Sequence, residues 1–168
     1  MMTLLYWGCL RIGEIAVSSH ADHVIGADQV SILPATLTRP RAISIVFHSY
    51  KHSKGDLPTV RVSAQHDTLV CPVTALDNYL AMRPPATSLA LFRHLLGPTI
   101  TRAFFVSHLH RLLKATQFRG LNINSHSFRI GRTTDLVIKG ASDAYIQKAG
   151  RWSSDAYKKY VRPQTITL

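Results

Sequence analysis

The chain has 168 residues, 46% of them hydrophobic and 17% charged, which is enough for one hydrophobic core and too few to expect two. Twenty Lys and Arg against nine Asp and Glu give a formal net charge of +11, which indicates a polyanionic partner such as nucleic acid. Cys9 and Cys71 form no C-x-x-C pair, so a disulfide framework and a zinc cage are both disfavoured and a reducing compartment is favoured. We expect one domain over residues 1–168.

The first segment, "TLLYWGCLRIGEIAVSS", carries apolar residues at three- and four-residue steps, the spacing of an amphipathic helix. Arg11 and Glu14 interrupt its apolar run well short of a membrane-spanning length. The segment therefore predicts one core helix, with Arg11 and Glu14 sharing its polar face.

Two strand-like runs follow, at about 43–50 and 58–63, on either side of a Lys-rich turn containing "KGD". They predict an antiparallel hairpin. In "CPVTALDNYLAMRPP", Pro72 stands near the start and Pro84 after the last turn, which is typical of a helix. A further helix is expected over 101–116.

Three more helices are expected after residue 124. Gly140 ends the first of them, because glycine accepts the left-handed conformation that closes many helices. Ser142 caps the second, which ends at Gly150, and Ser153 or Ser154 caps the third. Helices thus dominate beside one small antiparallel sheet, so the predicted fold class is α+β and mainly α-helical.

The charge is concentrated in the last part of the chain. Residues 101–168 hold twelve Lys and Arg and three Asp and Glu, whereas residues 1–100 hold eight and six. Within this basic part, His126 and Arg129 stand three residues apart, so on a helix they project from one face. A guanidinium can grip two phosphate oxygens, and an imidazole exchanges a proton near neutral pH. An isolated H-x-x-R pair is more often a capped helix with a solvated Arg.

The pair is part of a longer ordered set of residues. The set comprises "CLRIGE" near the start, a Lys in the hairpin turn, "HSFRIG", "GRW" and "YVRP". This order resembles the catalytic domain of the tyrosine recombinases, or phage integrases, over nearly the whole chain. The segments "HSFRIG", "GRW" and "DAYKKYVRP" are most similar to the eukaryotic mobile-element branch that includes Crypton-like and DIRS-like recombinases. The resemblance implies the fold of DNA breaking-rejoining enzymes, here without the family's preceding DNA-binding domain, so we expect an N-terminally truncated catalytic domain.

The resemblance also implies roles for individual residues. It makes Arg11 and Arg129 the two guanidinium clamps on the scissile phosphate, His126 the proton-transfer residue, Trp152 a phosphate contact and Tyr160 the nucleophile. Fixed Arg donors help most when charge builds on the phosphate oxygens in the transition state. Trp152 can donate one hydrogen bond but cannot act as a base.

Simpler interpretations stand beside these roles. Arg11 could be an ordinary helix residue paired with Glu14, and Trp152 could pack the last helices together. Tyr160 follows Trp152 by eight residues, one fewer than is common in the family, so Tyr157 stays an alternative nucleophile, although we expect it to pack in the core.

A hairpin lysine would protonate the leaving 5′ oxygen. We rank Lys51 ahead of Lys54 for this part.

The implied reaction is a transesterification without a metal or other cofactor, in which Tyr160 forms a 3′-phosphotyrosyl link and frees a 5′ hydroxyl. The expected partner is double-stranded DNA, bound largely through its backbone phosphates. The basic residues expected to contact it are Arg102, Arg111, Lys114, Arg119, Arg132 and Lys139. We expect a monomer without DNA, self-association on DNA as in the family's tetramers, and an intracellular location, nuclear in a eukaryote and cytoplasmic otherwise.

Three alternative functions remain open at this point. The chain could be a DNA-binding remnant of a mobile element that no longer cleaves, or a nicking-closing enzyme similar to type IB topoisomerases. A basic RNA-binding module fits less well, because the aromatic residues cluster with the active-site pattern instead of forming a stacking platform.

Overall fold

A computed structural model describes residues 1–18, 23–49, 57–83, 90–95 and 97–162. Its helices are α1 (Met2–Trp7), α2 (Ile12–Ile15), α3 (Pro72–Met82), α4 (Arg102–Lys114), α5 (Ser127–Ile138) and α6 (Asp143–Gly150), with the 3₁₀-helices η1 (Ala27–Gln29) and η2 (Asp155–Tyr160). Its strands are β1 (Val30–Leu33), β2 (Ala42–Val46) and β3 (Thr59–Ser63). The predicted class, mainly helical with a small antiparallel sheet, is confirmed. No helix in these ranges is long and apolar enough to cross a membrane.

The sheet has three strands in the order β1-β2-β3, and both neighbouring pairs are antiparallel. The register places Ile43 opposite Val62 and Ile45 opposite Val60. The predicted β2–β3 hairpin is therefore confirmed, although β1 was not expected. The turn that carries Lys51 and Lys54 lies outside the described residues.

The expectation of one continuous helix at the start of the chain is wrong. The segment forms two short helices, α1 and α2, separated by a break over residues 8–11. Gly8 follows α1, and Cys9 takes a left-handed backbone conformation with φ of 48°, which costs a residue with a side chain roughly 1–2 kcal/mol. Arg11 consequently lies at the N-cap of α2 with extended backbone angles, and not on a helix face.

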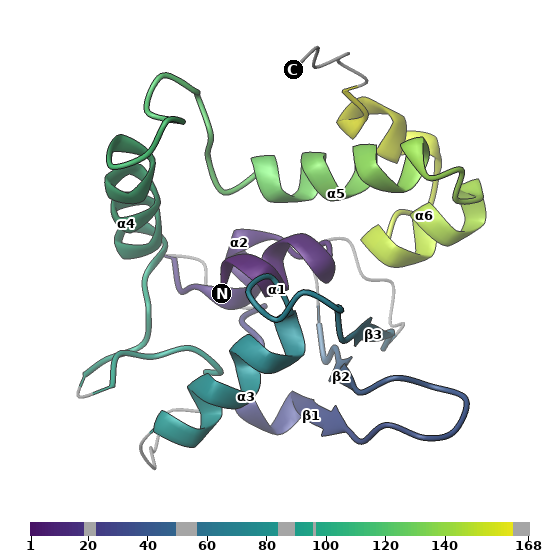
Figure 1. The fold of residues 1–168 in the computed structure, drawn as a ribbon, viewed down its shortest axis with the longest axis horizontal. Helices are drawn as coiled ribbons and strands as arrows, with labels where there is room; N and C mark the ends of the chain where they lie inside the picture. Colours follow the sequence, from purple (N-terminus) through teal and green to yellow (C-terminus); the bar gives the residue numbers. More distant parts are fainter. Residues whose placement is uncertain (19–22, 50–56, 84–89, 96, 163–168) are drawn as a thin grey trace.

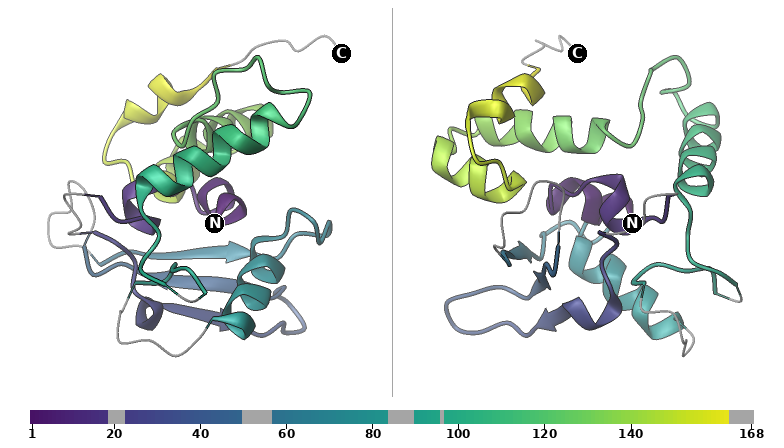
Figure 2. Two further views of the ribbon diagram at one scale, coloured as in Figure 1. Left: turned by 90° about the vertical axis from the view of Figure 1, so that its left-hand side faces the viewer. Right: turned by 180° about the vertical axis from the view of Figure 1, so that it is seen from behind.

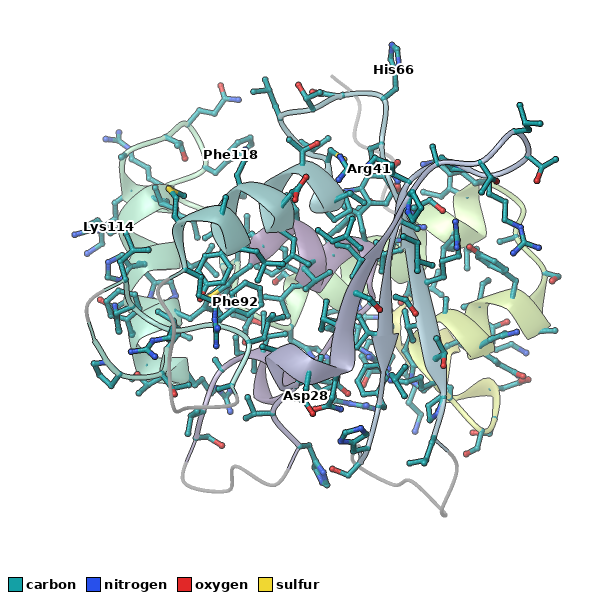
Figure 3. All side chains as sticks on the ribbon, turned by 90° about the horizontal axis from the view of Figure 1, so that it is seen from below. Asp28, Arg41, His66, Phe92, Lys114 and Phe118 are labelled. Carbon is teal, nitrogen blue, oxygen red and sulfur yellow. The ribbon has the colours of Figure 1, made fainter. Side chains whose placement is uncertain are left out.

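The short helix α1 lies in the middle of the molecule (Figures 1 and 2), where it packs against α5 on one side and α3 on the other. Most of the hydrophobic core lies between α1, the sheet and α3. Its fully buried members include Leu4, Leu5, Ile43, Ile45 and Phe47. In Figure 3, Phe92 lies inside the body near α3, whereas Lys114 lies at the outer edge of α4.

The helices after residue 124 follow the predicted punctuation. Gly140 closes α5 with φ of 72°, and Ser142 caps α6 by accepting a hydrogen bond from the backbone N–H of Tyr145 at 3.3 Å. The third element, η2, begins after Ser154 as predicted but is a 3₁₀-helix. The helices α5, α6 and η2 pack on one another around a second, smaller core, formed by Leu136, Ile146 and Tyr157.

A short parallel bridge ties the start of α4 to the chain that follows α2. The backbone N–H of Val17 donates to the carbonyl of Ile100, and that of Arg102 donates to the carbonyl of Val17, both at 2.9 Å. Thr101 caps α4 by accepting a hydrogen bond from the N–H of Phe104 at 3.1 Å. These bonds place the first turn of α4 beside the segment that carries Arg11.

Candidate active site

A cavity of about 680 Å³ lies where α2 and the starts of α4 and α5 meet η2. It is lined by Leu10, Arg11, Ile12, Gly13, Glu14, Ser18, His23, Arg102, Ser125, His126 and Tyr160. Arg11, His126 and Tyr160 thus share one cavity although they are far apart in the sequence. The lining carries two arginines and two histidines, which suits an anionic ligand.

Arg11 is held at this cavity by Glu14. Its backbone N–H donates to Glu14 Oε2 at 2.8 Å, and its Nη1 lies 3.4 Å from Oε1. The side chain of Arg11 is 23% exposed, whereas that of Glu14 is 3% exposed. The guanidinium therefore reaches the cavity, while the Glu14 carboxylate that anchors it is buried. The simpler interpretation, an exposed ion pair on a helix surface, does not describe this arrangement.

His126 stands just before α5, where its backbone N–H donates to Asn124 Oδ1 at 2.9 Å. Its ring centroid lies 4.9 Å from that of Tyr160. Burial, followed by the positive charges of Arg129 and Arg11, lowers the pKa of His126. The imidazole therefore favours its neutral form, which can accept a proton from a neighbouring hydroxyl.

Arg129 does not line the cavity. It is completely buried on α5, where Nη1 donates to the carbonyl of Cys9 at 2.5 Å and Nη2 donates to the carbonyl of Gly150. Its Nε has no hydrogen-bond partner among the described residues. Burial is the largest cause that lowers the pKa of Arg129 to about 10, so it stays charged at neutral pH. This guanidinium thus lies beneath the site, and each of its two terminal nitrogens donates a hydrogen bond to a backbone carbonyl.

Two aromatic rings cover Arg129. Its Cζ lies 4.2 Å from the centroid of the Trp152 ring and 5.6 Å from that of the Tyr160 ring. The Trp152 ring also lies 5.1 Å from Tyr160 and 6.2 Å from Tyr157. Trp152 therefore packs the last helices together, as in its simpler interpretation, and at the same time forms part of the wall around Arg129 and Tyr160.

The two candidate nucleophiles differ in environment. Tyr160 is half-buried at the end of η2 and lines the cavity. Tyr157 is only 3% exposed and packs with Leu136 and Ile146 in the second core. Burial and a hydrogen bond with Asp143 raise the pKa of Tyr157, which disfavours its phenolate. Tyr160 thus reaches the cavity. Tyr157 packs in the core, as expected from the sequence.

The residues predicted to contact DNA do not form one continuous surface. Arg102 lines the cavity, while Arg111 and Lys114 line an open hollow of about 620 Å³ on the surface of α4. Arg132 stacks on the Trp7 ring, with its Cζ 4.7 Å from the centroid. Lys139 is exposed and pairs with an Asp on the preceding turn of α5. Arg119 is exposed in the turn after α4. The candidate acids Lys51 and Lys54 lie outside the described residues.

Sequence reasoning missed three residues of the site. His23 and Ser125 line the cavity. The Nδ1 atom of His23 lies 2.9 Å from the Oγ of Ser49, which follows β2. Arg151 forms a buried ion pair with Glu14. Only Arg151 left a sequence signal, since it stands inside the "GRW" segment. Among the described residues, no three His, Cys, Asp or Glu side chains cluster in a way that could hold a metal ion.

Comparison of the backbone with solved structures identifies the fold. The chain superposes on the XerH site-specific recombinase, in a post-cleavage complex with a palindromic difH substrate, with a TM-score of 0.66, 15% identity and 98% of this chain covered. The XerA recombinase gives a TM-score of 0.67, 18% identity and 97% coverage, and the Tn1549 transposon integrase, in complex with circular intermediate DNA, gives 0.59, 16% and 98%. The chain has the catalytic-domain fold of the tyrosine recombinases.

The likeness is one of fold. The chain spans 41% of the XerH chain, 52% of the XerA chain and 53% of the Tn1549 integrase chain. No protein-family model and no curated protein matches its sequence. The assignment of the tyrosine recombinase fold therefore depends on the path of the backbone, and the assignment of chemistry depends on the cavity.

Proposed function

We propose that this chain provides the catalytic domain of a tyrosine recombinase, which cuts and rejoins double-stranded DNA through Tyr160. The observation that carries the proposal is the convergence of Arg11, His126 and Tyr160 on one cavity of a recombinase fold. The solved neighbours include DNA-bound recombinases and an integrase, which supports recombination as the class of reaction. The relation to Crypton-like and DIRS-like recombinases is part of this proposal and depends on the C-terminal sequence segments.

In the proposed reaction, the hydroxyl of Tyr160 attacks a DNA phosphorus and transfers its proton to neutral His126. A 3′-phosphotyrosyl link forms as the bond to the 5′ oxygen breaks, and that oxygen leaves as a hydroxyl after protonation by a lysine of the β2–β3 turn, Lys51 or Lys54. A 5′ hydroxyl of a partner strand reverses the step, so the bond energy is retained in the protein–DNA link.

Arg11 stabilises the charge that builds on the non-bridging oxygens, because its guanidinium is fixed at the cavity wall. Removing such a donor costs about 3 kcal/mol of transition-state stabilisation. Arg129 lies beneath the cavity, where its guanidinium packs against the Tyr160 ring and helps to hold it in place. Backbone carbonyls take two of the five N–H donors of Arg129, so a direct contact with the phosphate would use one of the others, such as Nε.

Outside the cavity, the basic surface of α4 binds the DNA backbone. Arg111 and Lys114 are exposed there, and Arg102 connects this surface to the cavity. We further propose that the chain is a monomer without DNA and self-associates on DNA. Light scattering of the free protein tests the first part, and a stable tetramer without DNA would contradict it.

A second candidate function is DNA binding without cleavage. This candidate is favoured because both terminal nitrogens of Arg129 donate hydrogen bonds to backbone carbonyls. The arginines that line the cavity are Arg11 and Arg102. A protein that only binds DNA would keep its affinity when Tyr160 is changed.

The decisive experiment traps the covalent intermediate on nicked duplexes selected from a random-sequence pool. Wild type should form a protein–DNA adduct that mass spectrometry locates at Tyr160. The variant Tyr160→Phe should form none, and the matched control Tyr157→Phe should still form it. An adduct at Tyr157 would overturn the assignment of the nucleophile. Duplex binding without any adduct would favour the second candidate, and relaxation of supercoiled plasmid at no defined site would favour a topoisomerase-like enzyme.

A further inference from the structure

Arg151 combines two unfavourable features immediately after α6. Its backbone takes the left-handed conformation, with φ of 56° and ψ of 47°, which costs roughly 1–2 kcal/mol for a residue with a side chain. Its side chain is only 2% exposed, yet it carries a charge. The Nη2 atom donates to Glu14 Oε2 at 2.6 Å, while Nε and Nη1 have no hydrogen-bond partner among the described residues.

Packing alone does not account for this arrangement. A buried ion pair recovers its desolvation cost only when the remaining polar atoms are also satisfied, and an apolar residue of similar size is often as stable or more stable. The guanidinium of Arg151 lies over the Phe47 ring, with its Cζ 4.4 Å from the centroid, which returns part of the cost. The position thus retains a charge although part of its desolvation cost is not recovered by hydrogen bonds.

The partner of Arg151 is the carboxylate that anchors Arg11. Glu14 Oε2 accepts hydrogen bonds from Arg151 Nη2 and from the backbone N–H of Arg11, and Oε1 lies 3.4 Å from Arg11 Nη1. Arg151 therefore occupies the oxygen that Arg11 would need for a two-point grip on Glu14. With that oxygen taken, the Arg11 side chain makes one long contact with Glu14 and, among the described residues, lines the cavity.

We infer that Arg151 is a positioning residue for Arg11, acting through Glu14. It fixes the carboxylate and keeps Arg11 from turning inward to pair with it. What Arg11 does at the cavity depends on the proposed function, whereas the coupling between Arg151, Glu14 and Arg11 does not. Without Arg151, the buried carboxylate would draw the Arg11 guanidinium away from the phosphate position.

The test compares wild type with Arg151→Met, Arg151→Lys and the double variant Glu14→Gln/Arg151→Met. The matched control is Tyr6→Phe, which removes the 2.7 Å hydrogen bond from Tyr6 to Asp135, a contact of α1 away from the cavity. At saturating duplex and well below the melting temperature, Arg151→Met should cleave about tenfold or more slowly, since small misplacements of a catalytic group have such effects. Its Kd for duplex should change by less than about threefold, because most phosphate contacts lie elsewhere.

The variants separate positioning from stability. Arg151→Lys keeps one charged donor and should recover most of the lost rate. The double variant removes both buried charges, and with them the carboxylate that would draw Arg11 inward, so it should regain stability and part of the rate relative to Arg151→Met. If Arg151→Met itself cleaves within about threefold of wild type, Arg151 does not act by positioning.

A second readout does not need activity. In ¹⁵N spectra of arginine side chains, the Arg11 signal should shift and broaden in Arg151→Met and stay unchanged in Tyr6→Phe. An unchanged Arg11 signal in Arg151→Met would overturn the inference even if the protein is an active recombinase. Absence of an adduct in wild type would overturn the proposed function and leave this readout in force.

Discussion

Replacing Gly150 by Ala tests how tightly the aromatic wall of the site is packed. A Cβ at this position would overlap the Cζ3, Cε3 and Cη2 atoms of the Trp152 ring. The ring cannot simply move away, because it lies between the Arg129 guanidinium and the rings of Tyr157 and Tyr160. Either the ring or the backbone must shift, and the backbone carbonyl of Gly150 is a hydrogen-bond acceptor for Arg129.

The expected magnitude follows from opposing contributions. Overpacking costs about 1–3 kcal/mol, and a weakened hydrogen bond to a charged donor costs about 1.5–3 kcal/mol. Alanine returns roughly 0.5–1 kcal/mol because it loses less conformational entropy than glycine in a helix. We therefore expect Gly150→Ala to lower the free energy of unfolding by about 3.5 kcal/mol, which corresponds to a melting temperature lower by about 7–14 °C for a chain of this length.

Urea unfolding and differential scanning calorimetry measure this change. The control is Gly120→Ala, at a position where an added Cβ meets no heavy atom of the described residues within 4 Å. Gly150→Ala should also lose covalent adduct more strongly than its stability loss explains, since Trp152 and Arg129 border Tyr160. Equal stability of the Gly150 and Gly120 variants would refute the packing of Trp152 on the Gly150 backbone.

Three further predictions concern the ends of α4 and α5. Burial and two neighbouring arginines lower the pKa of His126 below its ordinary 6.5. The contribution of this residue to the free energy of unfolding should therefore be fully present above pH 6.5 and be lost as the pH falls below it. In unfolding measured across this pH range, His126→Gln should remove that loss. Thr101→Ala should cost about 1 kcal/mol by removing the cap of α4, as measured by urea unfolding against Thr38→Ala at an exposed position. Changing Arg111 and Lys114 together to Gln should reduce the slope of log K against log salt by roughly 2, measured by fluorescence anisotropy with duplex DNA; an unchanged slope would place the DNA elsewhere.

The elements that the sequence predicted well are those in which local signals and tertiary packing agree. The helices α3, α4, α5 and α6 have clear caps or stops, such as Ser142 and Gly140, and regular apolar spacing. The break between α1 and α2 was not predictable in this way. The apolar spacing continues through Gly8 and Cys9, and the left-handed turn there is stabilised by distant partners, because the carbonyl of Cys9 accepts a hydrogen bond from Arg129 on α5.

The candidate site was predictable in part of its membership and not in its geometry. The order of motifs brought Arg11, His126 and Tyr160 to attention, and the fold brings all three to one cavity. Sequence spacing suggested that His126 and Arg129 point to the same place, because both were assigned to one helix face. His126 instead precedes the helix and lines the cavity, while Arg129 is buried behind the rings of Trp152 and Tyr160.

The electrostatics of the site depend on a single carboxylate. Arg11, Arg129 and Arg151 all act electrostatically on this region, and in the described residues Glu14 is the buried anion that contacts two of them. Three guanidiniums near one another repel, and burial increases the cost of each charge. Glu14 offsets part of that repulsion, and of these three arginines Arg11 is the one that lines the cavity. If the proposed function is right, a phosphodiester bound in the cavity would offset more of the repulsion.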